Sequence, residues 1–474
     1  MHSAMLRCTK NIGFMRTLFL VVFMFLLVAK MYSQKISGCF FNMPNQEISL
    51  HIYNGASSEI EIKVSTNSAG EFNIYYEGKS IEVGYLKVEN TKSFPILLNI
   101  EELEIVGSSL YEPQSIYLKK GAQNQLFQKI TEENNKRLIA IDALKYLTFY
   151  YQSLEEKIHS PAILNNFNEE LNRLSHEQTF SMYNLPSDGF LHWYFTIKNL
   201  INESIAESNN PSDNYFSIIQ KYRSIDYLDD RLYKSGLLKD VVESQFYLIE
   251  HCGLGIDSSF KQMQISIEDI LNNLAKDEKK YKDVLEFLFK SFEEHSLNNA
   301  LEYLSDFALA SNSCSINDDL KKKSESFQFL KKGDTVPNIL FDENFTIKKA
   351  EDTTKIKDLS QISANYTLVV FGASWCPKCA HEIPQLVAIY KQWHRLNLEI
   401  IFISLDENKT EFELFSQQFP FFSVCDFKKW ETQAALDYKI TSTPRLFLID
   451  KNRKIILKPN STEMLNEWLK NNLK

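Results

Sequence analysis

The stretch FGASWCPKC (Phe371–Cys379) decides the fold of the C-terminal third of the chain. It begins at the end of a continuous apolar run, Tyr366 to Phe371, which is typical of a strand buried on both faces. A helix is expected from about Pro377 to Arg395, because a proline at the first helical position loses no needed hydrogen bond. The two cysteines therefore lie where a buried strand passes into the N-terminus of a helix.

This position gives Cys376 and Cys379 different chemistry. The unpaired N–H groups and the positive dipole end of a helix N-terminus favour a thiolate at Cys376, and Lys378 adds a positive charge nearby. Cys379 comes three residues later, so it returns to the same helix face within reach of a disulfide bond. The spacing predicts Cys376 as the exposed nucleophile of low pKa and Cys379 as its buried partner.

Strands and helices alternate from this motif to the end of the chain. The segment Lys331–Pro337 marks a domain boundary. The apolar pattern beyond it predicts strands at 366–371, 398–405, 421–424, 445–450 and 454–458, and helices at 377–395, 411–418, 432–438 and 462–473. This alternation predicts an α/β domain over residues 331–474.

Residues 331–474 resemble a thioredoxin-fold domain of the TlpA/ResA-like thiol–disulfide oxidoreductases. The resemblance rests on Gly333–Pro337, on Phe371–Trp375 before the dithiol, on Pro384 where the family kinks its first helix, and on Thr443-Pro444. It implies that Thr443-Pro444 is a cis bond facing the dithiol, beside which a partner chain can pair as an extra strand. The implied substrate-binding residues are Trp375, Pro377, Lys378, Thr443 and Pro444.

The resemblance also implies a catalytic set of Cys376, Cys379 and Glu382. Val370 stands where ordinary thioredoxins keep a buried acid, whereas Glu382 matches an acid that ResA-like proteins carry on the helix. We therefore expect Glu382 to act as proton shuttle for Cys379, with an ordinary solvated carboxylate as the alternative. No bound cofactor is expected, because the redox centre is the disulfide Cys376–Cys379 itself.

Other uses of the two cysteines fit the sequence less well. A zinc site would need two more ligands, and the chain has neither a second C-x-x-C nor a nearby His pair. Covalent haem attachment needs a His directly after the second cysteine, and this position is Ala380. His381 is expected to be an ordinary helix residue. A peroxiredoxin would carry a hydroxyl residue at position 373, which is Ala373. No metal is therefore expected.

The five remaining cysteines carry weaker expectations. Cys425 lies in a predicted strand and is expected to be a buried, inert thiol, with a regulatory thiol as the alternative. Cys252 and Cys314 form a candidate pair, Cys39 reads as a small strand residue, and Cys8 leaves with the N-terminal segment described below.

The residues before the redox domain divide into two predicted regions. Residues 34–120 show period-2 alternation with turn signals, as in Ile48, Leu50 and Ile52, and this predicts a small antiparallel β domain. Residues 121–330 show helical spacing and predict one antiparallel bundle; an example is Ile267, Ile270, Leu271 and Leu274, with Ser266 and Asp269 as a capping signature in front. The expected fold class is thus multidomain α+β: a β domain, a helical bundle domain and a thioredoxin-like α/β domain.

The N-terminus is typical of an exported protein. Lys10 and Arg16 precede a short apolar run, Leu18 to Ala29, whereas a bilayer span needs about 20 apolar residues. The pattern predicts a signal peptide over residues 1–33 and a place in the periplasm or cell envelope. An uncleaved anchor is the alternative, and lipidation at Cys39 is a weaker one.

Composition excludes several classes of function. The 52 Lys and Arg against 61 Asp and Glu give a net charge of −9, and no Lys/Arg-dense stretch offers a surface for nucleic acid. Hydrophobic residues make up 44% and charged residues 24%, which excludes global disorder.

Together these features predict a thiol–disulfide oxidoreductase, with disulfide reduction as the expected direction. Its substrates would be disulfides or dithiols of envelope proteins, and the resemblance implies a membrane electron donor. Residues 34–330, which carry no recognisable chemistry, are expected to position the redox domain. The alternative is an envelope binding protein in which the thioredoxin fold is a docking platform.

Overall fold

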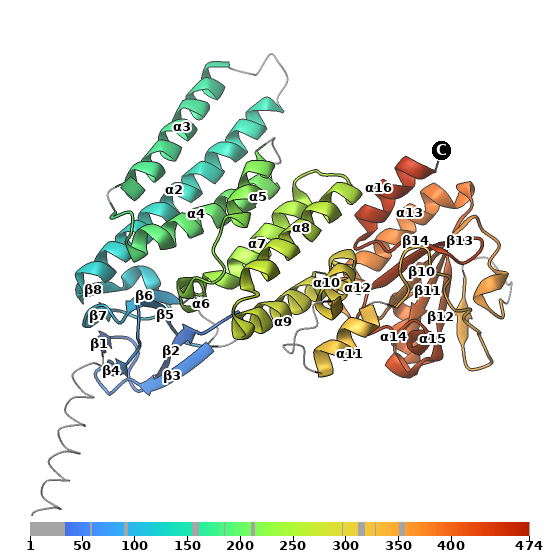
Figure 1. Cartoon of the computed structure of the whole chain (residues 1–474), viewed down its shortest axis with the longest axis horizontal. Helices are drawn as coiled ribbons and strands as arrows, with labels where there is room; N and C mark the ends of the chain where they lie inside the picture. Colours follow the sequence, from blue (N-terminus) through green and yellow to red (C-terminus); the bar gives the residue numbers. More distant parts are fainter. Residues whose placement is uncertain are drawn as a thin grey trace, which may run out of the picture. The chain divides into compact units, whose positions relative to one another are not determined.

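The computed structural model describes residues 34–56, 59–89, 93–153, 161–183, 185–209, 214–295, 297–310, 318–327, 329–349 and 356–473 (Figure 1). The predicted signal peptide, Cys8 and Cys314 lie outside these residues. The chain divides into two compact units, Met1–Glu207 with Phe216–Gln245 and Ser208–Tyr215 with Phe246–Lys474. The predicted helical domain is therefore shared between the two units, and its boundaries at 120 and 330 stay predictions.

The first unit contains two four-stranded sheets that pack on one apolar core. Their orders are β4-β1-β7-β8 and β3-β2-β5-β6. Ile48, Leu50 and Ile52 are buried in that core, as their alternation predicts. The strands are β1 (Gln34–Phe40), β2 (Glu47–Tyr53), β3 (Glu59–Ser65), β4 (Glu71–Tyr76), β5 (Glu82–Lys87), β6 (Phe94–Leu98), β7 (Leu103–Gly107) and β8 (Tyr117–Lys120).

The predicted antiparallel β domain is confirmed, with one exception in strand direction. β1 runs parallel to β7, while the other pairs in the two sheets are antiparallel. The alternation of apolar residues marks each strand but does not encode the direction of its neighbour.

A long run of helices follows the strands. It comprises α2 (Ala122–Gln152), α3 (Pro161–Tyr183), α4 (Phe190–Asn209), α5 (Tyr215–Arg223), α6 (Asp230–Ser235), α7 (Leu237–His251), α8 (Ile256–Leu274), α9 (Glu278–Glu294), α10 (Asn298–Ala310) and α11 (Asp318–Phe327). The apolar stripe predicted for α8 is buried as expected. The capping signature is wrong, because Ser266 is fully buried in the middle of α8, which begins ten residues earlier after Gly255.

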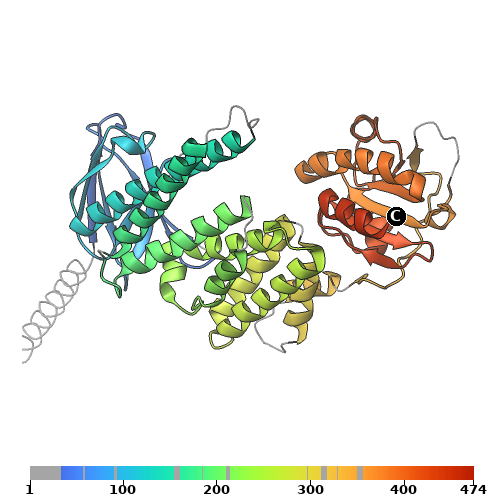
Figure 2. The ribbon, with the colours of Figure 1, turned by 90° about the horizontal axis from the view of Figure 1, so that it is seen from above.

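The C-terminal part of the second unit is a mixed sheet of order β14-β13-β10-β11-β12-β9, seen from a second side in Figure 2. β10 runs parallel to β11 and β11 to β12, whereas β13 is antiparallel to β10. The strands are β9 (Thr346–Lys348), β10 (Tyr366–Gly372), β11 (Leu398–Ser404), β12 (Phe422–Cys425), β13 (Arg445–Asp450) and β14 (Ile455–Leu457). They confirm each strand predicted in this region and add β9.

Helices pack on both faces of this sheet. Apolar side chains of β10 and β11 alternate, so that Leu368 and Val370 face one side while Val369 and Phe371 face the other. Four helices pack on the first face: α12 (Pro377–Glu382), α13 (Leu386–Trp393), α14 (Lys409–Phe415) and α16 (Thr462–Asn472). Helix α15 (Gln433–Asp437) packs on the second face. This two-sided burial explains why β10 reads as a continuous apolar run.

Within the described residues, no helix has the length and apolarity needed to span a bilayer.

Candidate active site

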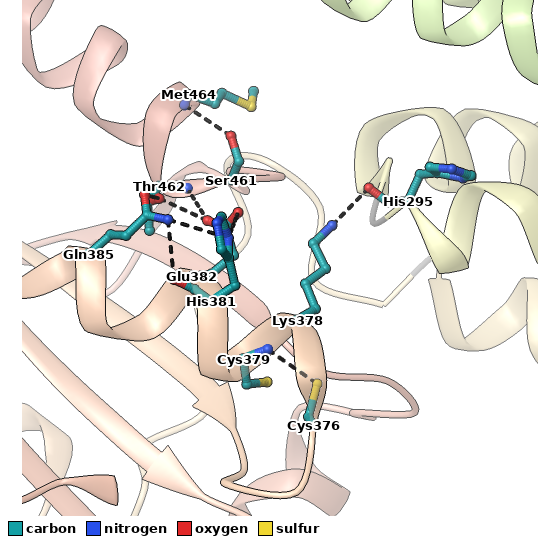
Figure 3. A network of polar contacts seen from close by, with 10 residues as sticks. All are labelled: His295, Cys376, Lys378, Cys379, His381, Glu382, Gln385, Ser461, Thr462 and Met464. Carbon is teal, nitrogen blue, oxygen red and sulfur yellow. Dashed lines mark hydrogen bonds and ion pairs between the residues drawn. The ribbon is translucent and has the colours of Figure 1, made fainter.

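The dithiol lies where β10 gives way to α12, as the sequence predicts (Figure 3). Cys376 is the N-cap residue of α12 and Pro377 is its first residue. The Cys376 sulfur accepts a hydrogen bond from the backbone N–H of Cys379, with an N–S distance of 3.4 Å. Gly372, the last residue of β10, leaves room for this pair, because a Cβ there would lie 3.3 Å from the Cys379 sulfur and collide with Ile383.

The two thiols differ in the direction in which their surroundings shift the pKa. A hydrogen bond from the Cys379 thiol is the main cause that lowers the pKa of Cys376, to about 5, and contacts with Thr443 and the helix N–H groups lower it further. The same hydrogen bond, together with burial, raises the pKa of Cys379. Cys376 is therefore the thiolate of the pair and Cys379 the protonated thiol.

The predicted exposure of Cys376 needs correction. Only 7% of Cys376 is exposed and Cys379 is fully buried, so the order is as predicted although both sulfurs are largely covered. An N-cap position predicts a thiolate, but it does not show which segments of the chain close over it.

Lys378 acts on Cys376 through its charge, as the sequence predicts, and also through its backbone N–H. Its side chain extends away from the sulfur, and its Nζ donates a hydrogen bond of 3.0 Å to the carbonyl oxygen of His295 (Figure 3). Burial lowers the pKa of Lys378. Its backbone N–H helps to lower the pKa of Cys376, and its ammonium group also interacts electrostatically with Cys376.

The other residues expected to bind substrate surround Cys376. The Thr443–Pro444 bond is cis, and the Thr443 carbonyl oxygen lies 3.4 Å from the Cys376 sulfur. Trp375 is 44% exposed and stacks edge-on against Trp430, with 5.9 Å between ring centroids. The structure thus brings Trp375, Pro377, Thr443 and Pro444 to one place around the dithiol.

Glu382 lies on α12 but is engaged with another helix. Its Oε2 accepts two hydrogen bonds of 2.8 Å, from the backbone N–H and the hydroxyl of Thr462, the first residue of α16. Its side chain is 13% exposed, so it is not an ordinary solvated carboxylate. Figure 3 shows it directed towards Thr462 rather than towards the sulfurs.

Asp406 is a residue of this site that sequence reasoning missed. It is fully buried after β11, and its carboxylate accepts hydrogen bonds from the backbone N–H (2.9 Å) and hydroxyl (2.7 Å) of Ser374 and from the hydroxyl of Ser404 (2.7 Å). It therefore fixes the loop that carries Trp375 and Cys376. The only sequence signal was an acid at the carboxyl end of a predicted parallel strand, the edge at which the active-site loop also lies.

Cys425 is buried beside this loop. Its Sγ donates to the carbonyl oxygen of Asp406 at 3.4 Å, and burial raises its pKa to about 11. This fits an inert thiol. Cys39 is partly exposed in β1, and its Sγ donates to the Ala69 carbonyl oxygen at 3.3 Å.

Among the described residues, no group of three or more His, Cys, Asp or Glu side chains is placed to hold a metal ion.

A family model and a curated relative both match the part of the chain that contains the redox domain, and a solved structure is also similar. Residues 364–455, which include the dithiol, match a family model described as thioredoxin-like. The thiol-disulfide oxidoreductase ResA of Bacillus thuringiensis subsp. konkukian is 30% identical over 131 residues, which cover 27% of this chain and 73% of ResA. A crystal structure of a thioredoxin-like protein from Bacteroides caccae is 16% identical, with a TM-score of 0.41 over 55% of this chain and 94% of that one.

Plant relatives match over a smaller share of their length. The probable nucleoredoxin 2 of Oryza sativa subsp. japonica is 28% identical over 116 residues, 23% of this chain and 28% of the relative. The match thus spans little more than a quarter of that nucleoredoxin. Because ResA is 30% identical and the match covers nearly three quarters of its length, the chain belongs to the thioredoxin-like family of thiol–disulfide oxidoreductases.

Proposed function

We propose that this protein reduces disulfide bonds of cell-envelope proteins through Cys376 and Cys379. The observation that carries thiol–disulfide exchange is the asymmetry of the dithiol: the surroundings lower the pKa of Cys376 and raise that of Cys379. The reducing direction rests on the resemblance to ResA. A nucleophile and a protonated resolving thiol are the two groups that thiol–disulfide exchange requires.

The reaction proceeds in two displacements. The Cys376 thiolate attacks one sulfur of the substrate disulfide, so a mixed disulfide forms and the other substrate sulfur leaves as a thiolate that takes a proton from solvent. Cys379 then loses its proton and attacks the Cys376 sulfur, which releases the second substrate thiol. The substrate gains two electrons and two protons, and the pair is left as the Cys376–Cys379 disulfide. A membrane electron donor, as the ResA resemblance implies, restores the dithiol.

Glu382 is the proposed acceptor of the Cys379 proton. It lies on the same short helix, one turn after Cys379, and is mostly buried. Its hydrogen bonds to Thr462 hold the carboxylate in place but direct it to α16. Proton transfer therefore needs a rotation of the Glu382 side chain or a bridging water molecule.

Thr443 and Trp375 are the proposed contacts for the substrate chain. The Thr443 carbonyl lies beside the attacking sulfur, where a strand of the substrate can pair with the backbone. The half-exposed Trp375 offers an apolar surface on the same side. The envelope location rests on the N-terminal Lys10 and Arg16 before the apolar run.

Two measurements test this function on the full chain. The reduction potential of the Cys376–Cys379 couple should lie near that of thioredoxin, about −270 mV, and a value near that of DsbA, about −120 mV, would make the protein an oxidant instead. Cys379→Ala should accumulate mixed disulfides with envelope proteins, whereas Cys376→Ala should not. If neither variant accumulates a mixed disulfide with an envelope protein, the proposed exchange reaction is contradicted.

A further inference from the structure

Residues at the junction of α9 and α10 contact both segments that flank Cys376. We call His295, Leu297 and Asn298 the α9–α10 corner. The carbonyl oxygen of His295 accepts the hydrogen bond from Lys378, two residues after Cys376 (Figure 3). Asn298 accepts a hydrogen bond from the Nη1 of Arg445, two residues after the carbonyl that touches Cys376. Neither contact involves the sulfurs, but each attaches the corner to a residue two positions after Cys376 or after Thr443.

Arg445 makes the second contact a strong one. Its side chain is almost fully buried, and burial lowers its pKa to about 10 although Glu293 and Glu302 lie near it. Its Nε has no hydrogen-bond partner among the described residues, so the bond to Asn298 is a large part of its polar contacts. A buried guanidinium that loses an acceptor is costly, and this ties Arg445 to the corner.

Asn298 of the corner and Glu302 farther along α10 make further polar contacts with the redox domain. The backbone N–H of Asn298 donates to Oδ1 of Asn460 at 3.0 Å, just before α16. Lys458, after β14, pairs with Glu302 of α10 at 3.0 Å, and both side chains are largely buried. Each of these contacts is a single polar interaction between two groups.

An open pocket lies between α8, α10 and the end of β14. Its volume is about 290 Å³, and Phe260, Glu302 and Leu457 are among the residues that line it. Interfaces of this polar kind allow relative motion of the parts that they join. A movement of the corner would therefore leave both apolar clusters of the sheet intact, because neither contains a residue of α9 or α10.

We propose that the α9–α10 corner is a specificity-determining wall of the dithiol site, which admits small or flexible disulfides and holds back bulky folded ones until α10 moves away. The proposal rests on the proposed function, because it concerns which substrates reach Cys376. Its physical basis is steric: the corner is held against the two segments that a substrate chain must approach.

The test compares two maleimides of the same reactivity and different size on the reduced full chain. The first is N-ethylmaleimide and the second carries a polyethylene-glycol chain of several kilodaltons. Modification is scored on the peptide that contains Cys376, and the readout is the ratio of the bulky to the small rate. Because this ratio measures access and not turnover, it remains informative even if exchange with envelope proteins fails.

Two substitutions at Asn298 should change the ratio in opposite directions. Asn298→Ala removes the acceptor of Arg445 and should raise the ratio at least about threefold, since a lost hydrogen bond to a buried charge favours an open corner. Asn298→Asp keeps the shape and adds a charge that strengthens this hydrogen bond, so the ratio should fall. Glu286→Ala, which breaks an exposed pair with Lys282 on α9, is the matched control and should leave the ratio unchanged.

A further variant keeps the proposal testable if Asn298→Ala does not fold. Glu302→Gln weakens the pair with Lys458 without changing the size of the side chain, and it should also raise the ratio. Wild-type ratios in both Asn298→Asp and Glu302→Gln would overturn the proposal, as would equal changes in the bulky and the small rate. If the ratio responds as expected but no envelope disulfide is reduced, the wall stands and the proposed function fails.

Discussion

Replacing Cys379 should move the pH at which Cys376 becomes reactive. The Cys379 thiol is the main group that lowers the pKa of Cys376 to about 5. A hydrogen bond to a charged group is worth about 1.5–3 kcal/mol, and about 1.4 kcal/mol corresponds to one pKa unit. Cys379→Ala should therefore raise the pKa of Cys376 by roughly one to two units, while the helix N–H groups and Thr443 continue to hold it below that of a free cysteine.

The sign of the effect follows from which form is stabilised. A lowered pKa means that Cys376 stays a thiolate as the pH falls, until the pH passes about 5. The Ala variant should lose its thiolate at a higher pH. Cys379→Ser retains an O–H donor in the same place, so its midpoint should lie between that of the wild type and that of the Ala variant.

The assay is the rate of alkylation of Cys376 by excess iodoacetamide as a function of pH, after full reduction of the protein. The rate follows the thiolate fraction, so each profile gives the pKa as its midpoint. A wild-type midpoint near 8.5, the value of a free thiol, would refute the assigned roles. So would an Ala profile that superimposes on the wild-type one, because the Cys379 thiol would then contribute nothing.

Three further predictions concern Glu382, Asp406 and the isolated redox domain. Glu382→Gln preserves an acceptor for Thr462, so the fold should persist while turnover falls and its pH dependence shifts; an unchanged pH–rate profile would leave Glu382 a structural residue. Asp406→Ala should lower the free energy of unfolding by roughly 2–4 kcal/mol, because it leaves the buried Ser404 hydroxyl and the partly buried donors of Ser374 without their acceptor. The exposed Glu407→Ala should have little effect in the same denaturant titration. Residues 331–474 should fold alone, because they contain all the buried residues of the two apolar clusters of the sheet except Leu330. The fragment should reduce a small disulfide at a rate comparable to the full chain but with less selectivity among proteins. A folded but inert fragment would show that residues 34–330 supply a catalytic group.

The sequence predicts most of the redox domain because the relevant signals are local. The apolar run of β10, Pro377 and the spacing of Cys376 and Cys379 each fix a short segment, and the structure has those segments as predicted. The resemblance adds Thr443-Pro444, which no local pattern ties to the dithiol.

Contacts between segments that are distant in the chain could not be predicted from the sequence. The alternation in β1 marks a strand but does not show that β7 runs parallel to it. Ser266 and Asp269 have the spacing of a cap, yet the apolar face of α8 begins earlier and buries Ser266. Asp406, His295 and Asn298 reach the site only through the tertiary fold, so their residue types carry no signal in isolation.

The hydrogen bonds between Glu382 and Thr462 connect proton transfer to the far end of the chain. A negative charge that accepts the first N–H of α16 stabilises that helix through its dipole. If Glu382 carries the Cys379 proton, each turnover removes this charge for a moment and loosens the first turn of α16. Amide hydrogen exchange at Thr462 and Met464 should then be faster under turnover than in the resting dithiol, and Glu382→Gln should abolish the difference. The C-terminal helix would thus report on the redox cycle without taking part in the chemistry.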